Sequence, residues 1–152
     1  MKKDIRIRRA TPEDADHIIQ FNRAMAKETE DRELAPEIIS AGVKRLLNQP
    51  QYGFYLLAEV DQQVVGSLMI TYEWSDWRDG LFWWVQSVYI KPEFRRQGIY
   101  RSLYSYVKLL AEKDGNVCGF RLYVEKENHI AHKTYHSLGM KETCYKMYEE
   151  LV

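Results

Sequence analysis

The segment from Val88 to Arg101 combines the residue types that bind a phosphate group. An apolar run ends at Ile90, Pro92 marks a turn, and a short basic stretch containing Gly98 leads into a helical pattern. A helix that begins after such a turn presents unpaired backbone N–H groups and the positive end of its dipole. Arginine adds charge-assisted hydrogen bonds to phosphate oxygens. The segment predicts a binding site for a phosphate-bearing ligand; by itself it fits a solvated basic turn equally well.

A second set of residues with regular spacing follows after a predicted strand. Asn128, Ala131 and Tyr135 stand at offsets of three, four and seven, so a helix would place them on one face. The chain contains neither the GxxxxGK[ST] pattern of a Walker loop nor the GxGxxG pattern of a dinucleotide fold. A phosphate site here therefore has to belong to another class of protein.

The two patterns together resemble the signatures of one family. Arg95-x-x-Gly98 resembles the pyrophosphate-binding motif of the GNAT superfamily of acyl-CoA-dependent N-acyltransferases, and Asn128-x-x-Ala131-x-x-x-Tyr135 resembles the second signature of that family. The resemblance covers essentially the whole chain and implies one domain over residues 1–152. It implies direct transfer of an acetyl group from acetyl-CoA (coenzyme A) to a primary amine of a small molecule or peptide. A non-catalytic acyl-CoA-binding or regulatory module of the same fold is the alternative.

The resemblance also assigns roles to residues. It implies that the pantetheine arm lies along the strand end formed by Val88, Tyr89 and Ile90, and that Tyr135 is the general acid that protonates the departing thiolate. Asn128 and Ala131 are expected to pack against the cofactor. The expected pyrophosphate-binding positions are Arg95, Arg96, Gln97, Gly98, Ile99, Tyr100 and Arg101. Tyr100 departs from the family, which usually has glycine or alanine there, so its side chain must point away from the pyrophosphate or it partly blocks the loop.

The acceptor amine needs a partner that binds it or takes its proton, because a protonated alkylamine cannot attack. No motif identifies a base. Glu73, after the third strand, and Glu28 are the candidate catalytic acids, and with Glu30 they are also candidates for binding a cationic amine; solvent-exposed loop carboxylates are the alternative. Trp84 is expected to line the acceptor pocket or to pack in the core. Gln86, a polar residue in an apolar strand, needs a partner and is expected to face the acceptor.

Composition limits the other functions. Lys plus Arg equals Asp plus Glu at 22 each, and the pI of about 6.9 argues against a nucleic-acid partner. No segment approaches the ~20 apolar residues of a membrane span, and the N-terminus lacks a signal peptide, so a soluble cytoplasmic protein is expected. No cysteine stands in a signature position, which favours direct transfer. His129, His132 and His136 lack companions for a metal site, so no metal is expected. The family resemblance makes a homodimer plausible.

Periodicity predicts the elements that must position these residues. The expected order is β-α-α-β-β-β-α-β-α-β, an α+β fold with a mixed, mostly antiparallel central sheet and about four helices, as in GNAT proteins. A charged connector is expected over 27–34 and a turn over 73–80. The predicted strands cover 5–8, 54–60, 64–72, 81–90, 119–125 and 142–149, and the predicted helices cover 12–27, 36–47, 98–113 and 128–138.

Overall fold

The computed structural model describes residues 3–152, which form two compact units. The first unit ends at Leu122, and the second runs from Tyr123 to Val152. The first unit contains the sheet and most of the helices, and the second contains one helix. That residues 1–152 act as a single domain stays a prediction.

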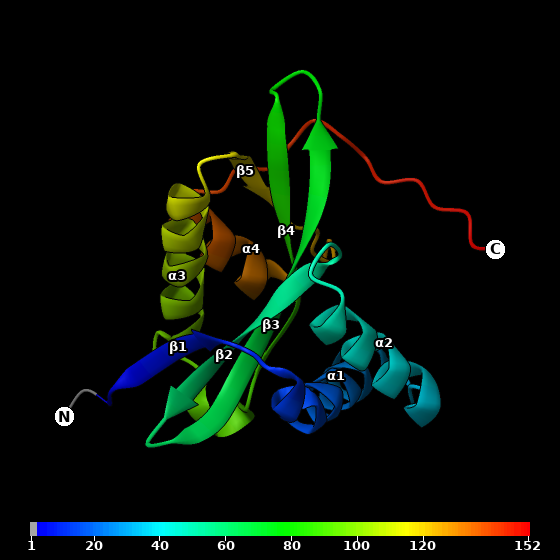
Figure 1. Ribbon diagram of the computed structural model, residues 1–152, viewed down its shortest axis with the longest axis vertical. Helices are drawn as coiled ribbons and strands as arrows, with labels where there is room; N and C mark the ends of the chain where they lie inside the picture. The colour runs from blue at the N-terminus through cyan, green and yellow to red at the C-terminus, as the bar shows by residue number, and fades with distance from the viewer. Residues whose placement is uncertain (1–2) are drawn as a thin grey trace. The chain divides into compact units, whose positions relative to one another are not determined.

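A five-stranded sheet forms the centre of the first unit, with its strands side by side in chain order (Figure 1). The strands are β1 (Ile5–Arg9), β2 (Gly53–Val60), β3 (Gln63–Ser75), β4 (Gly80–Ile90) and β5 (Val117–Arg121). The pairs from β1 to β4 are antiparallel, and β5 runs parallel to β4. A parallel pair needs a crossover connection, which helix α3 (Ile99–Asp114) supplies. The predicted α+β class and mostly antiparallel sheet are confirmed.

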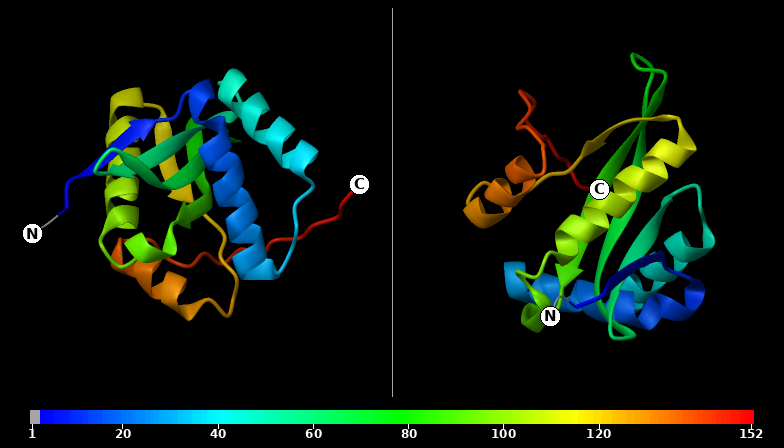
Figure 2. Two further views of the ribbon diagram at one scale, coloured as in Figure 1. Left: turned by 90° about the horizontal axis from the view of Figure 1, so that it is seen from below. Right: turned by 90° about the vertical axis from the view of Figure 1, so that its left-hand side faces the viewer.

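Helices cover both faces of this sheet, as Figure 2 shows for the first unit. Helices α1 (Ala15–Glu30), after the short turn η1 (Pro12–Asp14), and α2 (Pro36–Asn48) lie on one face, and α3 lies on the other. The two faces follow from the alternation of side chains along each strand. In β2, for example, Tyr55 and Leu57 pack beneath α1 and α2.

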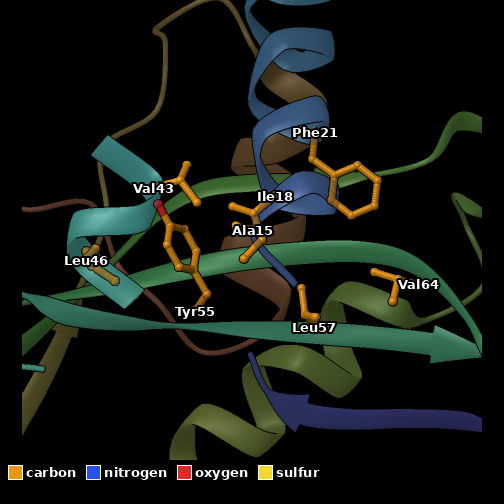
Figure 3. Close-up of a cluster of buried hydrophobic side chains, with 8 residues drawn as sticks. All are labelled: Ala15, Ile18, Phe21, Val43, Leu46, Tyr55, Leu57 and Val64. Atoms are coloured by element: carbon orange, nitrogen blue, oxygen red, sulfur yellow. The ribbon is translucent and has the colours of Figure 1, made fainter. Parts of the chain in front are cut away.

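The core under α1 and α2 explains why these segments are helical. Ile18 and Phe21 recur at helical spacing on α1 and point toward Leu57 in β2 (Figure 3). Ile18 is fully buried, and burying such a side chain contributes roughly 1.5–3 kcal/mol. The helix is therefore held over the sheet by its apolar face, which fixes the position of its C-terminal end.

That C-terminal end extends further than the sequence pattern predicted. The expected connector over residues 27–34 is wrong in its first part, because α1 continues to Glu30 and places Glu28 and Glu30 on its last turn. Lys27 Nζ donates to Asp31 Oδ1 at 2.7 Å, one helical turn later, and Asp31 ends the helix in a left-handed conformation with φ 47°. A charged sequence without glycine or proline has nothing to stop the helix earlier.

The hairpin between β3 and β4 is also longer than predicted. Glu73 was expected in a turn over residues 73–80, but the antiparallel ladder continues to the pair Ser75 and Gly80, so Glu73 lies inside β3. Each added pair satisfies backbone groups, and only residues 76–79 remain to turn the chain. The predicted strand over residues 119–125 begins and ends earlier, as β5, because its pairing with β4 stops at Arg121.

The second unit contains helix α4 (His129–Ser137), close to its predicted bounds. The predicted strand over residues 142–149 is wrong: within the described part of the chain, no strand follows α4. A segment becomes a strand only when its backbone pairs with a neighbour, and residues 142–149 pair with none of the described strands. Tyr145, Met147 and Tyr148 are accordingly exposed.

Candidate functional site

Strand β4 separates from β5 before it ends. The last residues that pair across the two strands are Trp84 and Arg121, although β4 continues to Ile90. A β-bulge lies in this part of β4, where Ser87 has a φ of 51° and the register against β3 shifts. Bulges bend a strand and re-aim it. Within residues 3–152, no strand pairs with this stretch of β4 on its β5 side, and Ile90 O instead accepts a hydrogen bond from Arg95 Nε.

The chain next forms a loop that ends in unpaired backbone N–H groups at the start of α3. After the short turn η2 (Pro92–Phe94), Arg96 and Gly98 adopt left-handed conformations with φ 62° and 81°. The Ser102 N–H bonds to Gly98 O at 3.0 Å, so the three N–H groups before it have no acceptor inside α3. Amides arranged this way at a helix N-terminus bind anions. The loop therefore fits the predicted pyrophosphate group.

Tyr100 does not fill this loop with its ring. The ring stacks on Tyr104, one turn further along α3, with centroids 6.2 Å apart and planes 5° from parallel. Tyr104 in turn meets Phe120 of β5 edge-on at 5.8 Å. This packing holds the Tyr100 ring against α3.

Arg95 binds the loop to two other elements. Its Nη1 and Nη2 atoms donate to the two carboxylate oxygens of Glu28 on α1, each at 2.7 Å, and its Nε donates to Ile90 O at 2.8 Å. The hydrogen bond from Arg95 holds the pKa of the Glu28 carboxyl below its usual value. The sequence assigned Arg95 to phosphate and Glu28 to the acceptor amine. In the structure these two side chains bind each other.

A second arginine–glutamate pair lies on the sheet face that α1 and α2 cover in part. Trp84 Nε1 donates to Glu73 Oε1 at 2.8 Å, and Arg121 Nη1 donates to Oε1 and Oε2 of Glu73 at 3.1 and 2.9 Å. The Arg121 guanidinium lies over the Phe82 ring, 3.6 Å from its centroid. Sequence reasoning missed Arg121. The available signal was a charged residue between Phe120 and Leu122 in a predicted strand, since a charge in such a place needs a partner.

Gln86 lies on the same face. Its Nε2 donates to Thr71 Oγ1 at 2.6 Å, which supplies the partner that a half-buried amide needs. The register places Gln86 opposite Met69, which packs against the core under α1 and α2. Glu73, Trp84 and Gln86 thus share one face of the sheet, and their role in binding an acceptor stays a prediction. Glu30 is exposed at the end of α1.

The second unit contains the remaining predicted residues. Asn128 is the N-cap of α4, and its Oδ1 accepts a hydrogen bond from Ala131 N at 3.2 Å. Burial raises the pKa of the Tyr135 hydroxyl, which keeps it protonated at neutral pH. His132 Nε2 lies 3.0 Å from Glu125 O. The roles of Asn128, Ala131 and Tyr135 toward the cofactor stay predictions.

Among residues 3–152, no group of three or more histidine, cysteine, aspartate or glutamate side chains could hold a metal ion. In the same residues, no helix has the length and apolar character needed to cross a membrane.

Known proteins share this sequence pattern and this fold. The model of the acetyltransferase (GNAT) family matches residues 15–140. The thialysine N-epsilon-acetyltransferase of Caenorhabditis elegans is 26% identical over 115 residues, which are 76% of this chain and 70% of that protein. A possible acetyltransferase from Clostridium difficile 630 is 50% identical, with a TM-score of 0.90 over 97% of each chain. The aminoglycoside N-acetyltransferase AAC(6')-Iy, solved with CoA, shares the fold at 17% identity, with a TM-score of 0.77 over 99% of this chain and 97% of that one.

Proposed function

The chain belongs to the GNAT acetyltransferase family, and from this premise we propose that it transfers an acetyl group directly to a primary amine of a small molecule or peptide. Acetyl-CoA is the cofactor of this family and, when bound, supplies the acetyl group as an activated thioester. The observation that supports the proposal is a pair of backbone segments in the first unit without the usual partners: the end of β4 beyond Trp84, which β5 no longer pairs, and the N–H groups that precede Ser102, which have no acceptor inside α3.

Each of these two backbone segments is proposed to bind a different part of the cofactor. The loop from Arg96 to Arg101 offers backbone N–H groups and positive charge, which suit the pyrophosphate. The end of β4, Val88–Ile90, offers backbone groups to the pantetheine arm and an N–H that can polarise a carbonyl oxygen. Arg95 is proposed to hold the loop in place. Its guanidinium already donates to the Glu28 carboxylate and to the Ile90 carbonyl. For Asn128 and Ala131 of the second unit, contact with the cofactor is likewise proposed, supported by the family match over residues 15–140.

Tyr135 is proposed as the general acid. A thiol has a pKa of ~8.5 and a tyrosine ~10, so a tyrosine hydroxyl can share or donate a proton as charge develops on sulfur. Burial raises the pKa of Tyr135 further, so the hydroxyl keeps its proton until that charge appears. Cys118 and Cys144 have no place in either signature, and the proposal therefore contains no acyl-enzyme.

The acceptor is proposed to bind on the face that carries Glu73, Trp84 and Gln86. Glu28 is a weak proton acceptor, because Arg95 lowers its pKa, and with Glu30 it serves to attract a cationic amine. Glu73 binds a cationic group, and the amine that reacts loses its proton to water. The relative from C. elegans is named for acetylating the ε-nitrogen of thialysine, which supports a small amine as acceptor here. A single cytoplasmic domain that forms homodimers is part of this proposal.

The cofactor assignment is tested by thermal unfolding. Acetyl-CoA at 100 times its Kd should stabilise the protein by about 2.7 kcal/mol and raise its Tm, because it binds the folded chain alone. The absence of any shift at millimolar acetyl-CoA would refute the cofactor site. A shift without release of free thiol, over a broad panel of amines, would instead favour a non-catalytic acyl-CoA-binding module.

The role of Tyr135 is tested by the variant Tyr135→Phe. General acid catalysis contributes about 100-fold or more, so kcat should fall by at least tenfold while the Kd of acetyl-CoA changes little. Tyr145→Phe is the matched control, because Tyr145 is an exposed tyrosine of the same unit. An unchanged kcat in Tyr135→Phe would remove this residue as the acid.

A further inference from the structure

The β-bulge in β4 determines which face of the sheet receives the side chain of Tyr89. Met69 of β3 pairs with Gln86 of β4. Ser67, two residues earlier in β3, pairs with Tyr89, three residues later in β4. Side chains alternate between the two faces of a sheet, so this one extra residue turns every later side chain of β4 to the opposite face. Tyr89 therefore shares the face of Gln86, which α1 and α2 cover in part.

The contacts of the Tyr89 ring agree with this placement. The half-buried ring packs against the core under α1 and α2, with its centroid 5.3 Å from that of Phe21 in α1. The Arg95 guanidinium also lies over this ring, with Cζ 5.6 Å from the centroid. A guanidinium within ~6 Å of an aromatic centroid is attracted to the face of the ring. The Tyr89 side chain thus contacts both α1 and the loop that precedes α3.

Tyr89 completes the set of contacts that hold Arg95. Glu28 and the Ile90 carbonyl accept hydrogen bonds from Nη1, Nη2 and Nε of the guanidinium, whereas the Tyr89 ring contacts the group from another side. Hydrogen bonds fix the edges of a guanidinium, and an aromatic ring supports it by stacking and by charge. Without the ring, the Arg95 side chain and the loop that it holds would have more freedom to move.

The backbone and the side chain of Tyr89 belong to different parts of the proposed cofactor site. Its backbone lies in Val88–Ile90, the segment proposed for the pantetheine arm, and its side chain contacts Arg95, which is proposed to hold the loop for the pyrophosphate. The chain between the pyrophosphate and the thioester has a fixed number of bonds. The separation of the two segments therefore decides where the thioester lies, and an error of about 1 Å in the position of a reacting group can cost about 100-fold in rate.

We propose that Tyr89 is a positioning residue: its side chain, turned toward α1 by the bulge, fixes Arg95 and thereby the separation between the strand end and the cofactor loop. This inference rests on the proposed function. Tyr89 acts through Arg95 on the pyrophosphate end of the cofactor, and this effect is separate from its contribution to the stability of the core.

A double-mutant cycle tests the path through Arg95. In Tyr89→Leu the Kd of acetyl-CoA, measured by calorimetric titration, should rise by about three- to tenfold, because the ring no longer supports the guanidinium. In the Arg95→Ala background the same substitution should cause almost no further rise, because the two residues act as one unit. Equal losses of affinity with and without Arg95 would overturn the inference.

Further variants of the same core separate positioning from structural support. Tyr89→Phe keeps the ring that Arg95 contacts and should keep the Kd of acetyl-CoA within about twofold. Tyr89→Met, whose flexible side chain fills gaps in cores, replaces Tyr89→Leu if the Tm shows that the latter is unfolded. Tyr55→Leu is the matched control, because Tyr55 lies in the same core beside Val43 of α2 (Figure 3). It should lower the Tm and keep the Kd; a Kd that rises as it does in Tyr89→Leu would assign the effect to the core as a whole and overturn the inference.

A fragment of the cofactor distinguishes this inference from the proposed function. S-acetylpantetheine lacks the pyrophosphate, and its affinity is measured by competition with acetyl-CoA in the same titrations. Its Kd should be the same in the parent protein and in Tyr89→Leu, so the preference for acetyl-CoA should fall by the factor that acetyl-CoA loses. An equal loss for both ligands overturns the inference and leaves acetyl transfer standing. If the parent protein binds no acetyl-CoA, the proposed function and this inference are refuted together.

Discussion

The ion pair between Arg95 and Glu28 differs from the one between Arg121 and Glu73 in how much of each guanidinium the protein uses. Arg95 directs both terminal nitrogens at Glu28 and its Nε at Ile90 O. Arg121 gives a single nitrogen to Glu73 and rests on Phe82. The first pair joins a loop to a helix, whereas in the second the hydrogen bonds to Glu73 come from Nη1 of Arg121 alone.

This difference separates support from recognition. A side chain whose donors are all directed at protein acceptors stabilises one arrangement of the backbone, whereas a fixed side chain with open donors can bind a ligand. We therefore assign Arg95 to the shape of the cofactor loop and Arg121 to the acceptor. The same comparison weakens Glu28 as a base, because the hydrogen bond from Arg95 lowers the pKa of its carboxyl.

The largest expected effect concerns Arg95. In Arg95→Ala the loop loses its hydrogen bonds to Glu28 and Ile90, and the Kd of acetyl-CoA should rise by about 10- to 100-fold, or about 1.4–2.8 kcal/mol. Arg121→Gln is the matched control, since it is expected to change the binding of the acceptor and to leave the Kd of acetyl-CoA nearly the same. Calorimetric titration with acetyl-CoA measures both variants. Equal losses of acetyl-CoA affinity in the two would abolish the distinction between the pairs.

A third ion pair, distant in sequence from both, shows what a purely structural role looks like. Arg8 donates to both oxygens of Asp14 at 2.8 and 2.9 Å, and this bond lowers the pKa of Asp14 from 3.8 to about 2. The contribution to stability is full above pH 3.8 and is lost as the pH falls through 2. Asp14→Asn should thus lower the free energy of unfolding by about 2 kcal/mol at neutral pH.

Chemical denaturation at pH 7 and near pH 2 measures this change. The difference between Asp14→Asn and the parent protein should shrink at the lower pH, and acetyl-CoA affinity should stay the same. Asp16→Asn is the control, because Asp16 is exposed at the start of α1, two residues further along the chain. A destabilisation that persists unchanged at pH 2 would mean that Asp14 acts through packing instead of charge.

The smallest expected effect concerns Glu28. Its side chain is 43% exposed, and an exposed ion pair contributes about 0.2–1 kcal/mol. Because Arg95 lowers the pKa of Glu28, the stabilisation is present above pH 4.5 and is lost as the pH falls below that value. Glu28→Gln should lower the Tm by a few degrees at pH 7 and by less near pH 3.5. If Glu28→Gln lowered the Tm as much as Asp14→Asn does, the Arg95–Glu28 pair would contribute to stability as the Arg8–Asp14 pair does.

Much of the fold and of the cofactor loop could be predicted from the sequence. The helix over Ile99–Asp114 and the strands around Leu57 follow from local periodicity, and the signature around Gly98 led to the family that the comparisons identify. Glu28 and Glu73 were placed in the wrong kind of element, because helix and strand ends depend on capping and pairing that a pattern does not contain. Arg121 was missed because it belongs to no signature.

The sequence by itself determined which residue types follow one another: a turn with Gly98 before a helix, and Asn128, Ala131 and Tyr135 at helical spacing. Such features need only a few neighbouring residues to be read. Only the tertiary structure decided that Arg95 binds Glu28, 67 positions away, and that Arg121 binds Glu73, 48 positions away. These contacts depend on where α1 packs and on the register of β3, β4 and β5. A hydrogen bond forms only when that packing brings donor and acceptor within about 3 Å.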